Sequence, residues 1–120
     1  MSLQKKKIIN FNDAKSFFNK KRNKKIIHCH GVFDLVHPGH IRHFDHCKTK
    51  ADLLVVSLTP DKYINKGNYR PLVPEKIRAN NLAAIELIDF IIIDKFKFPY
   101  ELIKRIKPNF FAKGMEYFLQ

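Results

Sequence analysis

Short, continuous apolar runs separated by helical segments constrain the fold of this chain more than any other feature. Residues 52–58 read DLLVVSL and residues 89–94 read DFIIID, so apolar side chains do not alternate with polar ones in either run. Strands of this kind are buried on both faces, which is typical of parallel sheets covered by helices. The sequence therefore predicts an α/β fold built on a parallel sheet.

Helical segments alternate with the strands along the chain. Further strands are expected at residues 26–32 and 109–113. Pro74 followed by Glu75 predicts a helix start, because proline is tolerated at the first helical position and a carboxylate suits the positive end of the helix dipole. The expected helices cover residues 12–18, 38–48, 74–87 and 99–106, and residues 59–73 are expected to form a long loop with one helical turn. The order β-α-β-α-β-α-β predicts right-handed crossovers and helices on both faces of the sheet.

Length and composition set further bounds. With 120 residues, of which 45% are hydrophobic, the chain is predicted to form one domain, residues 1–120, with a modest core. No apolar run reaches the roughly 18 residues that a membrane helix needs, and the first residues lack the apolar core of a signal peptide. The two cysteines are too few for a disulfide framework and are expected to be reduced. We therefore expect a cytoplasmic protein.

The chain is strongly basic, with 23 Lys and Arg, 11 Asp and Glu, and a formal net charge of +12. This excess predicts an anionic partner, which charge alone leaves open among nucleotide, polynucleotide, phospholipid and acidic protein. The basic runs at residues 5–7 and 20–25 lie in a basic N-terminal segment, residues 1–25. These runs are expected to be solvated surface, with an electrostatic funnel for phosphates as the alternative.

Residues 30–40, HGVFDLVHPGH, follow the first expected strand and carry chemistry that packing does not explain. The Pro-Gly pair before His40 opens a helix, whose free N–H groups and positive dipole end favour phosphate. His37 and His40 are three residues apart, so their imidazoles point roughly the same way on a first helical turn. Gly31 and Gly39 would let a ligand approach the backbone. The sequence thus predicts paired imidazole donors that position and stabilise a transferring phosphoryl group.

Three polar segments follow expected strands, at residues 31–40, 59–70 and 113–117. In open parallel sheets, ligands bind beyond the carboxyl ends of the strands. Because those ends share one edge of the sheet, we expect the three segments to meet there and form a ligand site.

Residues 31–40, GVFDLVHPGH, resemble the GxFDxxHxGH signature of the cytidylyltransferase-like nucleotidyltransferases. Further along the chain, Lys66-Gly67 resembles the Lys-Gly of the family's second loop, RPLVPEKIR at 70–78 resembles RPxxPxxxR, and IKRIKPNFFAKGMEY at 103–117 resembles KPDxxxKGxDY. The resemblance covers about residues 26–117. It is closest to the adenylyltransferase domain of ADP-heptose synthase, with glycerol-3-phosphate cytidylyltransferases and archaeal FAD synthetases as alternatives. It implies a Rossmann-like three-layer α/β sandwich.

The resemblance also implies an activity. A nucleoside monophosphate, with AMP favoured, would pass from an NTP to a phosphorylated acceptor such as a sugar phosphate, with release of pyrophosphate. ADP-heptose synthesis for the lipopolysaccharide core is the example closest to this sequence. The resemblance leaves ATP and CTP open as substrates. Mg²⁺ would be carried on the triphosphate, with no dedicated metal site in the protein. A homodimer is the family's usual state.

Individual residues receive roles from the same resemblance. The catalytic residues would be His37, His40 and Lys66. The nucleotide would be bound by Gly31, Val32, Phe33, Gly39, Arg78, Lys113, Gly114 and Glu116. The acceptor would be bound by His30 and Arg70, and Asp34 would organise the turn or meet the acceptor.

Two departures from the family pattern stand out. Glu116 occupies the place of the family's Asp, and its side chain is one methylene longer. The chain stops at Gln120, before the Ser/Thr-rich segment that binds phosphate in many relatives. We expect either a truncated sequence or a site completed in another way, for example by a second subunit.

Other interpretations concern single residues. All six histidines and both cysteines lie between residues 28 and 47, so a zinc site is an alternative. The sequence has no CxxC, and closed structural zinc sites need four ligands. We expect no metal site and expect His28, His43 and His46 to be exposed or packing residues. For Lys66 and Arg78 the alternative is an ordinary surface position.

A non-enzymatic nucleic-acid-binding module is the alternative of another class, because the chain is so basic. Nothing in the sequence resembles a helix-turn-helix, an RNA-recognition sheet or a zinc finger. Polynucleotide binding would weaken steeply with salt and would survive loss of His40. Catalysis would not survive that loss, so one substitution separates the two interpretations.

Overall fold

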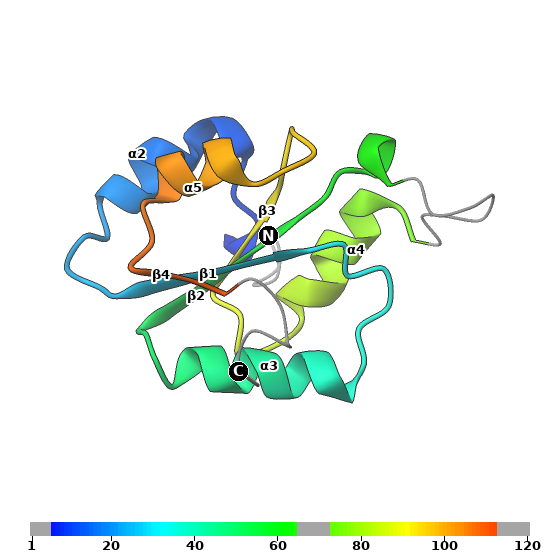
Figure 1. Cartoon of the computed structure of the whole chain (residues 1–120), viewed down its shortest axis with the longest axis horizontal. Coiled ribbons are helices and arrows are strands. Elements are labelled where there is room, and N and C mark those ends of the chain that lie inside the picture. Colours follow the sequence, from blue (N-terminus) through cyan, green and yellow to red (C-terminus); the bar gives the residue numbers. More distant parts are fainter. Residues whose placement is uncertain (1–5, 65–72, 113–120) are drawn as a thin grey trace.

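The structure of this chain is a computed structural model, and it describes residues 6–64 and 73–112. In Figure 1 a parallel sheet lies between two layers of helices. The strands are β1 (Ile26–Gly31), β2 (Leu53–Leu58), β3 (Phe90–Ile93) and β4 (Phe110–Ala112). The helices are α2 (Ala14–Asn19), α3 (Pro38–Lys48), α4 (Glu75–Ala83) and α5 (Tyr100–Ile106), with short 3-10 helices η1 (Phe11–Asp13) and η2 (Asp61–Tyr63). The predicted Rossmann-like α/β sandwich is confirmed.

The strand order places the point where the chain reverses its direction across the sheet next to β1. The sheet has the order β3-β2-β1-β4, and all its strand pairs are parallel. From β1 the chain first builds outward through β2 and β3, and then returns to add β4 on the other side of β1. Ligands bind at such a reversal point, beyond the carboxyl ends of the strands. The segment that follows Gly31 begins at this point.

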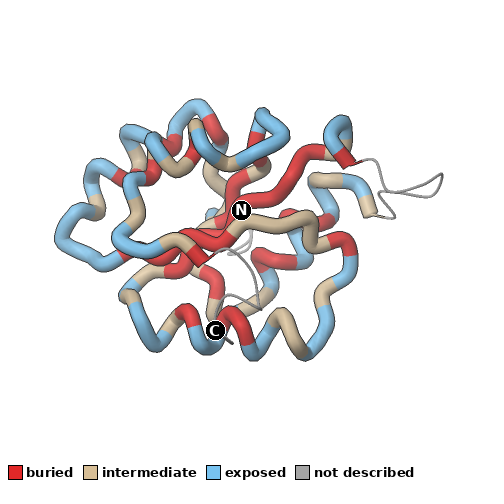
Figure 2. Tube along the Cα trace, in the orientation of Figure 1, coloured by how far each residue is buried: buried red, intermediate tan, exposed pale blue. Residues whose placement is uncertain are grey.

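The core consists of two apolar layers, one on each face of the sheet. Successive residues of a strand point to opposite faces, so Ile26 packs in the layer beneath α2 and α5, and Ile27 packs in the layer beneath α3 and α4. The buried stretches of Figure 2 run along the strands. Burial on both faces explains why β2 and β3 read as continuous apolar runs.

Two element boundaries differ from the prediction. The helix α4 ends at Ala83 rather than near residue 87, because the next residues turn toward β3. The Asp89 carboxylate at that turn accepts the backbone N–H of Leu54 and also pairs with Lys48. At the N-terminal end, Asn10 rather than Asn12 caps the first turn, since its side chain accepts the Asn12 N–H.

No helix in the described ranges is long and apolar enough to cross a membrane. Cys29 and Cys47 are buried free thiols, as expected for reduced cysteines.

Candidate active site

The two histidines of the HPGH stretch cap the helix α3 reciprocally. His37 is the N-cap residue, and its Nδ1 accepts the Gly39 N–H at 3.0 Å. The His37 N–H in turn donates to His40 Nδ1 at 3.1 Å. Pro38 begins the helix, where its missing N–H costs nothing. The local sequence therefore builds a capping box from two imidazoles.

This capping arrangement fixes which ring nitrogens face away from the helix end. A neutral imidazole that accepts a hydrogen bond at Nδ1 carries its proton on Nε2. The two rings lie with their centroids 3.9 Å apart and tilted by 39°. Burial, followed by the effect of His37, lowers the pKa of His40, which favours its neutral form. The predicted pair of N–H donors thus has a structural cause, namely the cap, which occupies both Nδ1 atoms.

The Phe33 ring packs against the His40 ring of the histidine pair. The centroid of the Phe33 ring lies 5.5 Å from the centroid of the His40 ring, in an edge-on arrangement, and 5.6 Å from the centroid of the Phe44 ring. Phe33 has φ 52°, in the left-handed region that non-glycine residues rarely adopt. A Cβ atom on Gly31 would lie 2.9 Å from the Phe33 ring. Gly31 is therefore required by the Phe33 ring, and its contact with a nucleotide stays a prediction.

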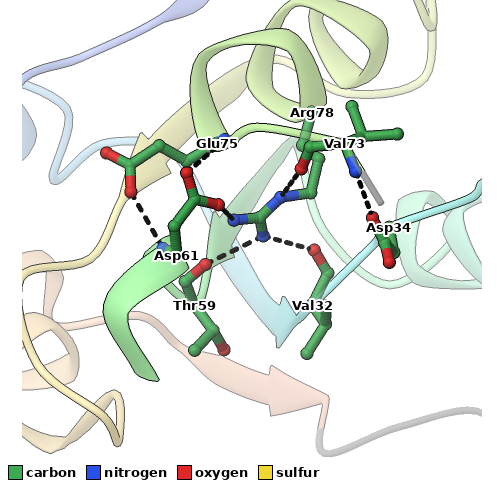
Figure 3. A network of polar contacts seen from close by, with 7 residues as sticks. All are labelled: Val32, Asp34, Thr59, Asp61, Val73, Glu75 and Arg78. Atoms are coloured by element: carbon green, nitrogen blue, oxygen red, sulfur yellow. Dashed lines mark hydrogen bonds and ion pairs between the residues drawn. The ribbon is translucent and has the colours of Figure 1, made fainter. Parts of the chain in front are cut away.

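Arg78 connects the segments that surround the site (Figure 3). Its guanidinium donates to the carbonyl oxygens of Val32 and Thr59, each at 2.8 Å, and of Val73 at 2.9 Å. A fourth hydrogen bond, of 2.6 Å, goes to Asp61 Oδ1. The side chain is fully buried, so the surface alternative is wrong. Arg78 holds the ends of β1 and β2 against the start of α4, and its contact with a nucleotide stays a prediction.

Two carboxylates complete this network in Figure 3. Asp61 and Glu75 exchange hydrogen bonds, each side chain accepting the other residue's N–H, at 2.9 and 3.1 Å. Asp34 is buried, and its Oδ1 accepts the Val73 N–H at 2.8 Å. Asp34 thus organises the turn after β1, which is one of its two predicted roles. Its contact with an acceptor stays a prediction.

His30 lies half-buried at the end of β1, on the face opposite Cys29. Its Nδ1 is 2.6 Å from Ser57 Oγ, and its Nε2 is 3.3 Å from Thr59 Oγ1. His28 reaches the same Ser57 oxygen at 2.7 Å. Burial lowers the pKa of His28 to about 3 and that of His30 to about 4. Sequence analysis missed Ser57, although a hydroxyl inside the apolar run LLVVSL was a usable signal, and it included Thr59 only as part of the segment at residues 59–70.

The remaining predicted residues divide into two groups. Gly39 is the second residue of α3, and its N–H already binds His37. Val32 lies at the start of the segment that leads to α3, and its carbonyl binds Arg78. The other predicted site residues lie outside the described part of the chain: Lys66, Arg70, Lys113, Gly114 and Glu116.

His43 and both cysteines lie together on the face of the sheet that α3 and α4 cover. His43 Nε2 lies 3.4 Å from Cys29 Sγ and 3.9 Å from Cys47 Sγ, beneath α3. His28 and His30 are on the opposite face. Within residues 6–64 and 73–112, no three His, Cys, Asp or Glu side chains are arranged to hold a metal ion. His28 and His43 are buried packing residues.

A groove of about 560 Å³ opens beside His37, between α3 and α4. Its lining combines apolar side chains with the polar side chains of Arg42 and Asn81. Of the imidazole pair, His37 is among the residues that line this groove.

The chain belongs to the cytidylyltransferase-like family. The family model of that description matches residues 28–120, which begins within β1 and includes the histidine pair and all the elements that follow. The predicted class, a nucleotidyltransferase domain, is thereby confirmed. The resemblance carried by GVFDLVHPGH is confirmed as well.

The particular relatives are bifunctional proteins. The chain is 42% identical over 100 residues to the bifunctional protein HldE of Pelobacter propionicus, a match that covers 82% of this chain and 20% of that protein. The HldE of Campylobacter jejuni is also 42% identical over 100 residues, covering 82% of this chain and 22% of that protein. The chain thus matches about a fifth of the length of these relatives. The matches agree with the predicted likeness to the ADP-heptose synthase group.

A solved structure with the same fold illustrates the structural likeness. It is the crystal structure of the lipopolysaccharide core biosynthesis protein from Thermoplasma volcanium, with a TM-score of 0.65 and 24% sequence identity. The likeness covers 81% of this chain and 84% of that one. It supports the Rossmann-like architecture described above.

Proposed function

We propose that this domain transfers a nucleoside monophosphate from an NTP to a phosphorylated acceptor and releases pyrophosphate. AMP transfer to a sugar phosphate, as in ADP-heptose synthesis for the lipopolysaccharide core, is the favoured form, because the HldE relatives belong to that group. CTP-dependent transfer to glycerol 3-phosphate and an FAD-synthetase-like reaction are the alternatives. The observation that carries the proposal is the imidazole pair, in which both Nδ1 atoms are occupied by the cap.

In this reaction the acceptor phosphate attacks the α-phosphorus of the NTP in line, and pyrophosphate leaves. The Nε2–H groups of His37 and His40 donate to the α-phosphate oxygens and stabilise the charge that develops there. No covalent enzyme intermediate is needed. Holding the two anions together in a productive geometry lowers such a barrier by roughly 7–11 kcal/mol. The surplus of Lys and Arg offsets the repulsion between those anions.

Mg²⁺ would enter with the triphosphate, where it neutralises phosphate charge. Two carboxylates near the site already have protein partners, since Asp34 accepts the Val73 N–H and Asp61 accepts Arg78. We therefore derive no contact between these two residues and the metal ion, and a metal held by substrate phosphates fits the donors that are present.

The remaining site roles are part of this proposal. Lys66 and Arg78 would offset phosphate charge, and Arg70 and His30 would bind the acceptor. Backbone atoms at Gly31, Val32, Phe33 and Gly39, with Lys113, Gly114 and Glu116, would bind the nucleotide. An NTP-dependent reaction also fits the cytoplasmic location that the sequence predicts.

A homodimer is proposed as the working state. Exposed apolar side chains support it: Leu35 is 64% exposed, Ile41 38% and Ile77 51%, and Ile41 also lines the groove. Exposed apolar side chains of this size favour contact with another protein surface. Light scattering coupled to size exclusion would measure the mass, and a monomer at all concentrations would contradict this part of the proposal.

The reaction is tested by measuring pyrophosphate release from ATP and from CTP, with Mg²⁺ and a panel of sugar phosphates. His40→Ala is expected to reduce turnover by roughly 100-fold or more, because it removes one of the two donors. His46→Ala is the matched control, since His46 is an exposed histidine on the same helix. Equal turnover in both variants would contradict the proposed role. Salt-sensitive binding of polynucleotide that survives His40→Ala would favour the nucleic-acid-binding alternative.

A further inference from the structure

Four polar side chains form a connected series beneath the carboxyl edge of the sheet. The series runs from His28 through Ser57 and His30 to Thr59, and we refer to it as the His28–Thr59 relay. Its contacts are 2.7 Å from His28 Nε2 to Ser57 Oγ, 2.6 Å from Ser57 Oγ to His30 Nδ1, and 3.3 Å from His30 Nε2 to Thr59 Oγ1. Ser57 lies directly opposite His30 in the pairing of β1 with β2.

Each member of the relay has a limited number of protons. Burial keeps both imidazoles neutral at pH 7, because it lowers the pKa of His28 to about 3 and that of His30 to about 4. Each ring therefore carries one N–H, and the Ser57 hydroxyl carries one O–H. Ser57 can donate to only one of its two histidine partners. When Ser57 donates to one histidine, it accepts a hydrogen bond from the other. The donors of the relay therefore point either from His28 toward Thr59 or from His30 toward His28.

The apolar end of the relay selects the direction. His28 is fully buried, its Nδ1 has no hydrogen-bond partner among residues 6–64 and 73–112, and its ring packs edge-on against Phe111. In the reverse direction, His30 would donate to Ser57 and Ser57 would donate to His28 Nε2, so the single proton of His28 would be on Nδ1. That Nδ1 would then be a buried N–H without an acceptor, which is rarer in proteins than an unpaired acceptor. If both rings donated to Ser57, its own proton would lack an acceptor, because the described contacts of Ser57 Oγ are the two rings.

The favoured direction therefore starts at His28. His28 Nε2–H donates to Ser57, and Ser57 O–H donates to His30 Nδ1. His30 then carries its proton on Nε2 and donates to Thr59 Oγ1. The last proton of the relay, on the Thr59 hydroxyl, is left for a group outside it.

Thr59 is fixed next to the candidate active site. Its N–H donates to the carbonyl of Gly31 at 3.1 Å, and its own carbonyl accepts Arg78 at 2.8 Å. The same Arg78 nitrogen holds the Val32 carbonyl. The donor end of the relay is thus attached to the segment that leads to the imidazole pair.

We propose that the His28–Thr59 relay presents the Thr59 O–H as a donor to an anionic oxygen of the acceptor substrate. The inference rests on the proposed transfer reaction and deepens it, because it assigns the acceptor's oxyanion to this end of the site. Thr59 is the binding residue, His30 acts on the acceptor through Thr59, and Ser57 and His28 are positioning residues that set the tautomer of His30.

The direction of the relay is tested in the wild-type chain, so the test does not depend on the folding of a variant. NMR of the chain labelled with ¹⁵N-histidine distinguishes protonated from unprotonated ring nitrogens. We expect His30 and His28 to be protonated at Nε2 and unprotonated at Nδ1. A His30 ring protonated at Nδ1 would overturn the proposal. Ser57→Thr, which keeps the hydroxyl, should preserve the His30 tautomer, and Ser57→Ala should not.

Binding is tested with inorganic phosphate as the probe, followed through the His30 ring nitrogens and the Thr59 amide. Thr59→Val keeps the shape of the side chain but loses the donor, and Thr59→Ser keeps the donor. We expect the Kd at this site to rise about tenfold in Thr59→Val, as for the loss of one hydrogen bond to an anion, and to stay near the wild-type value in Thr59→Ser. Phosphate that shifts His37 and His40 but leaves His30 and Thr59 unchanged would overturn the proposal.

Pyrophosphate release separates failure of this inference from failure of the proposed function. If turnover occurs and Thr59→Val leaves the KM of the sugar phosphate unchanged, the relay proposal is wrong and the transfer reaction stands. If no NTP and sugar phosphate react but phosphate still perturbs His30, the transfer reaction is wrong and the oxyanion site stands.

Discussion

At the scale of single residues, the buried arginine is the side chain with the largest structural consequence. Arg78 makes four hydrogen bonds, three to backbone carbonyls and one to the Asp61 carboxylate. The guanidinium suits this arrangement because its N–H groups form a planar fork. It holds together loops that start at β1 and β2, so the shape of the site depends on a residue that is itself buried.

Arg78→Met is therefore expected to lower the free energy of unfolding by about 3–5 kcal/mol, since it leaves three backbone carbonyl oxygens without their donor and each unsatisfied buried acceptor costs about 1–3 kcal/mol. Urea denaturation measures the loss. Lys76→Ala is the control, because Lys76 is exposed on the same helix, and it should change stability by less than about 0.5 kcal/mol. An Arg78→Met variant as stable as the wild type would contradict the clamp role.

Gly31 and Phe33 form a second residue-scale pair. Gly31→Ala is expected to cost about 1–3 kcal/mol through overpacking, because its Cβ would lie 2.9 Å from the Phe33 ring. Removing the ring in Phe33→Ala should relieve part of that cost. A double-mutant cycle in urea measures the coupling. Additive losses, with no coupling between the two positions, would show that the contact is unimportant.

At the scale of elements, the start of α3 combines a structural and a chemical task in the same side chains. His37 and His40 close the first turn through their Nδ1 atoms and leave Nε2 for a ligand. Sequence reasoning foresaw the helix from Pro38 and the closeness of the two rings, and their role as donors stays a prediction. It did not foresee that the rings cap the helix, because the cap depends on the extended backbone at His37.

The two tasks of His37 are separable by substitution. His37→Asn supplies another good N-cap side chain, so we expect nearly wild-type stability and a severe loss of pyrophosphate release. His37→Ala should lose the activity and also about 1 kcal/mol of stability. Urea unfolding and the pyrophosphate assay together measure the split. An active His37→Asn variant would contradict the chemical role of the ring.

The strands were predictable because a strand that is buried on both faces has a continuous apolar sequence. The strands β2 and β3 are contained within the apolar runs at residues 52–58 and 89–94. The end of α4 was predicted too late, since the turn at Asp89 depends on contacts with Leu54 and Lys48 from another part of the chain. The Arg78 network was hidden for the same reason, because three of its four partners are backbone carbonyls that any residue type supplies.

At the scale of the whole molecule, the net charge of +12 is the dominant property. It raises the local concentration of anionic substrates, an effect that salt screens. The screening length falls from roughly 10 Å at 0.1 M salt to roughly 3 Å at 1 M. The fold and the charge together therefore fit a domain that must bring two phosphorylated substrates to one edge of a sheet.

We accordingly expect the KM for the NTP to rise several-fold between low and high salt, while kcat changes less. Initial rates of pyrophosphate release measure both constants. Thermal unfolding at the same salt concentrations is the control, because it separates screening from loss of the fold. A KM that does not depend on salt would contradict a role for the net charge in substrate capture.

The most direct test of the central claim is a crystal structure of the chain with Mg²⁺ and a non-hydrolysable ATP analogue. The account predicts that Nε2 of His37 and Nε2 of His40 both lie about 3 Å from oxygens of the triphosphate, at hydrogen-bond distance. Imidazole rings turned away from the phosphates, or bound to a metal ion instead, would contradict it.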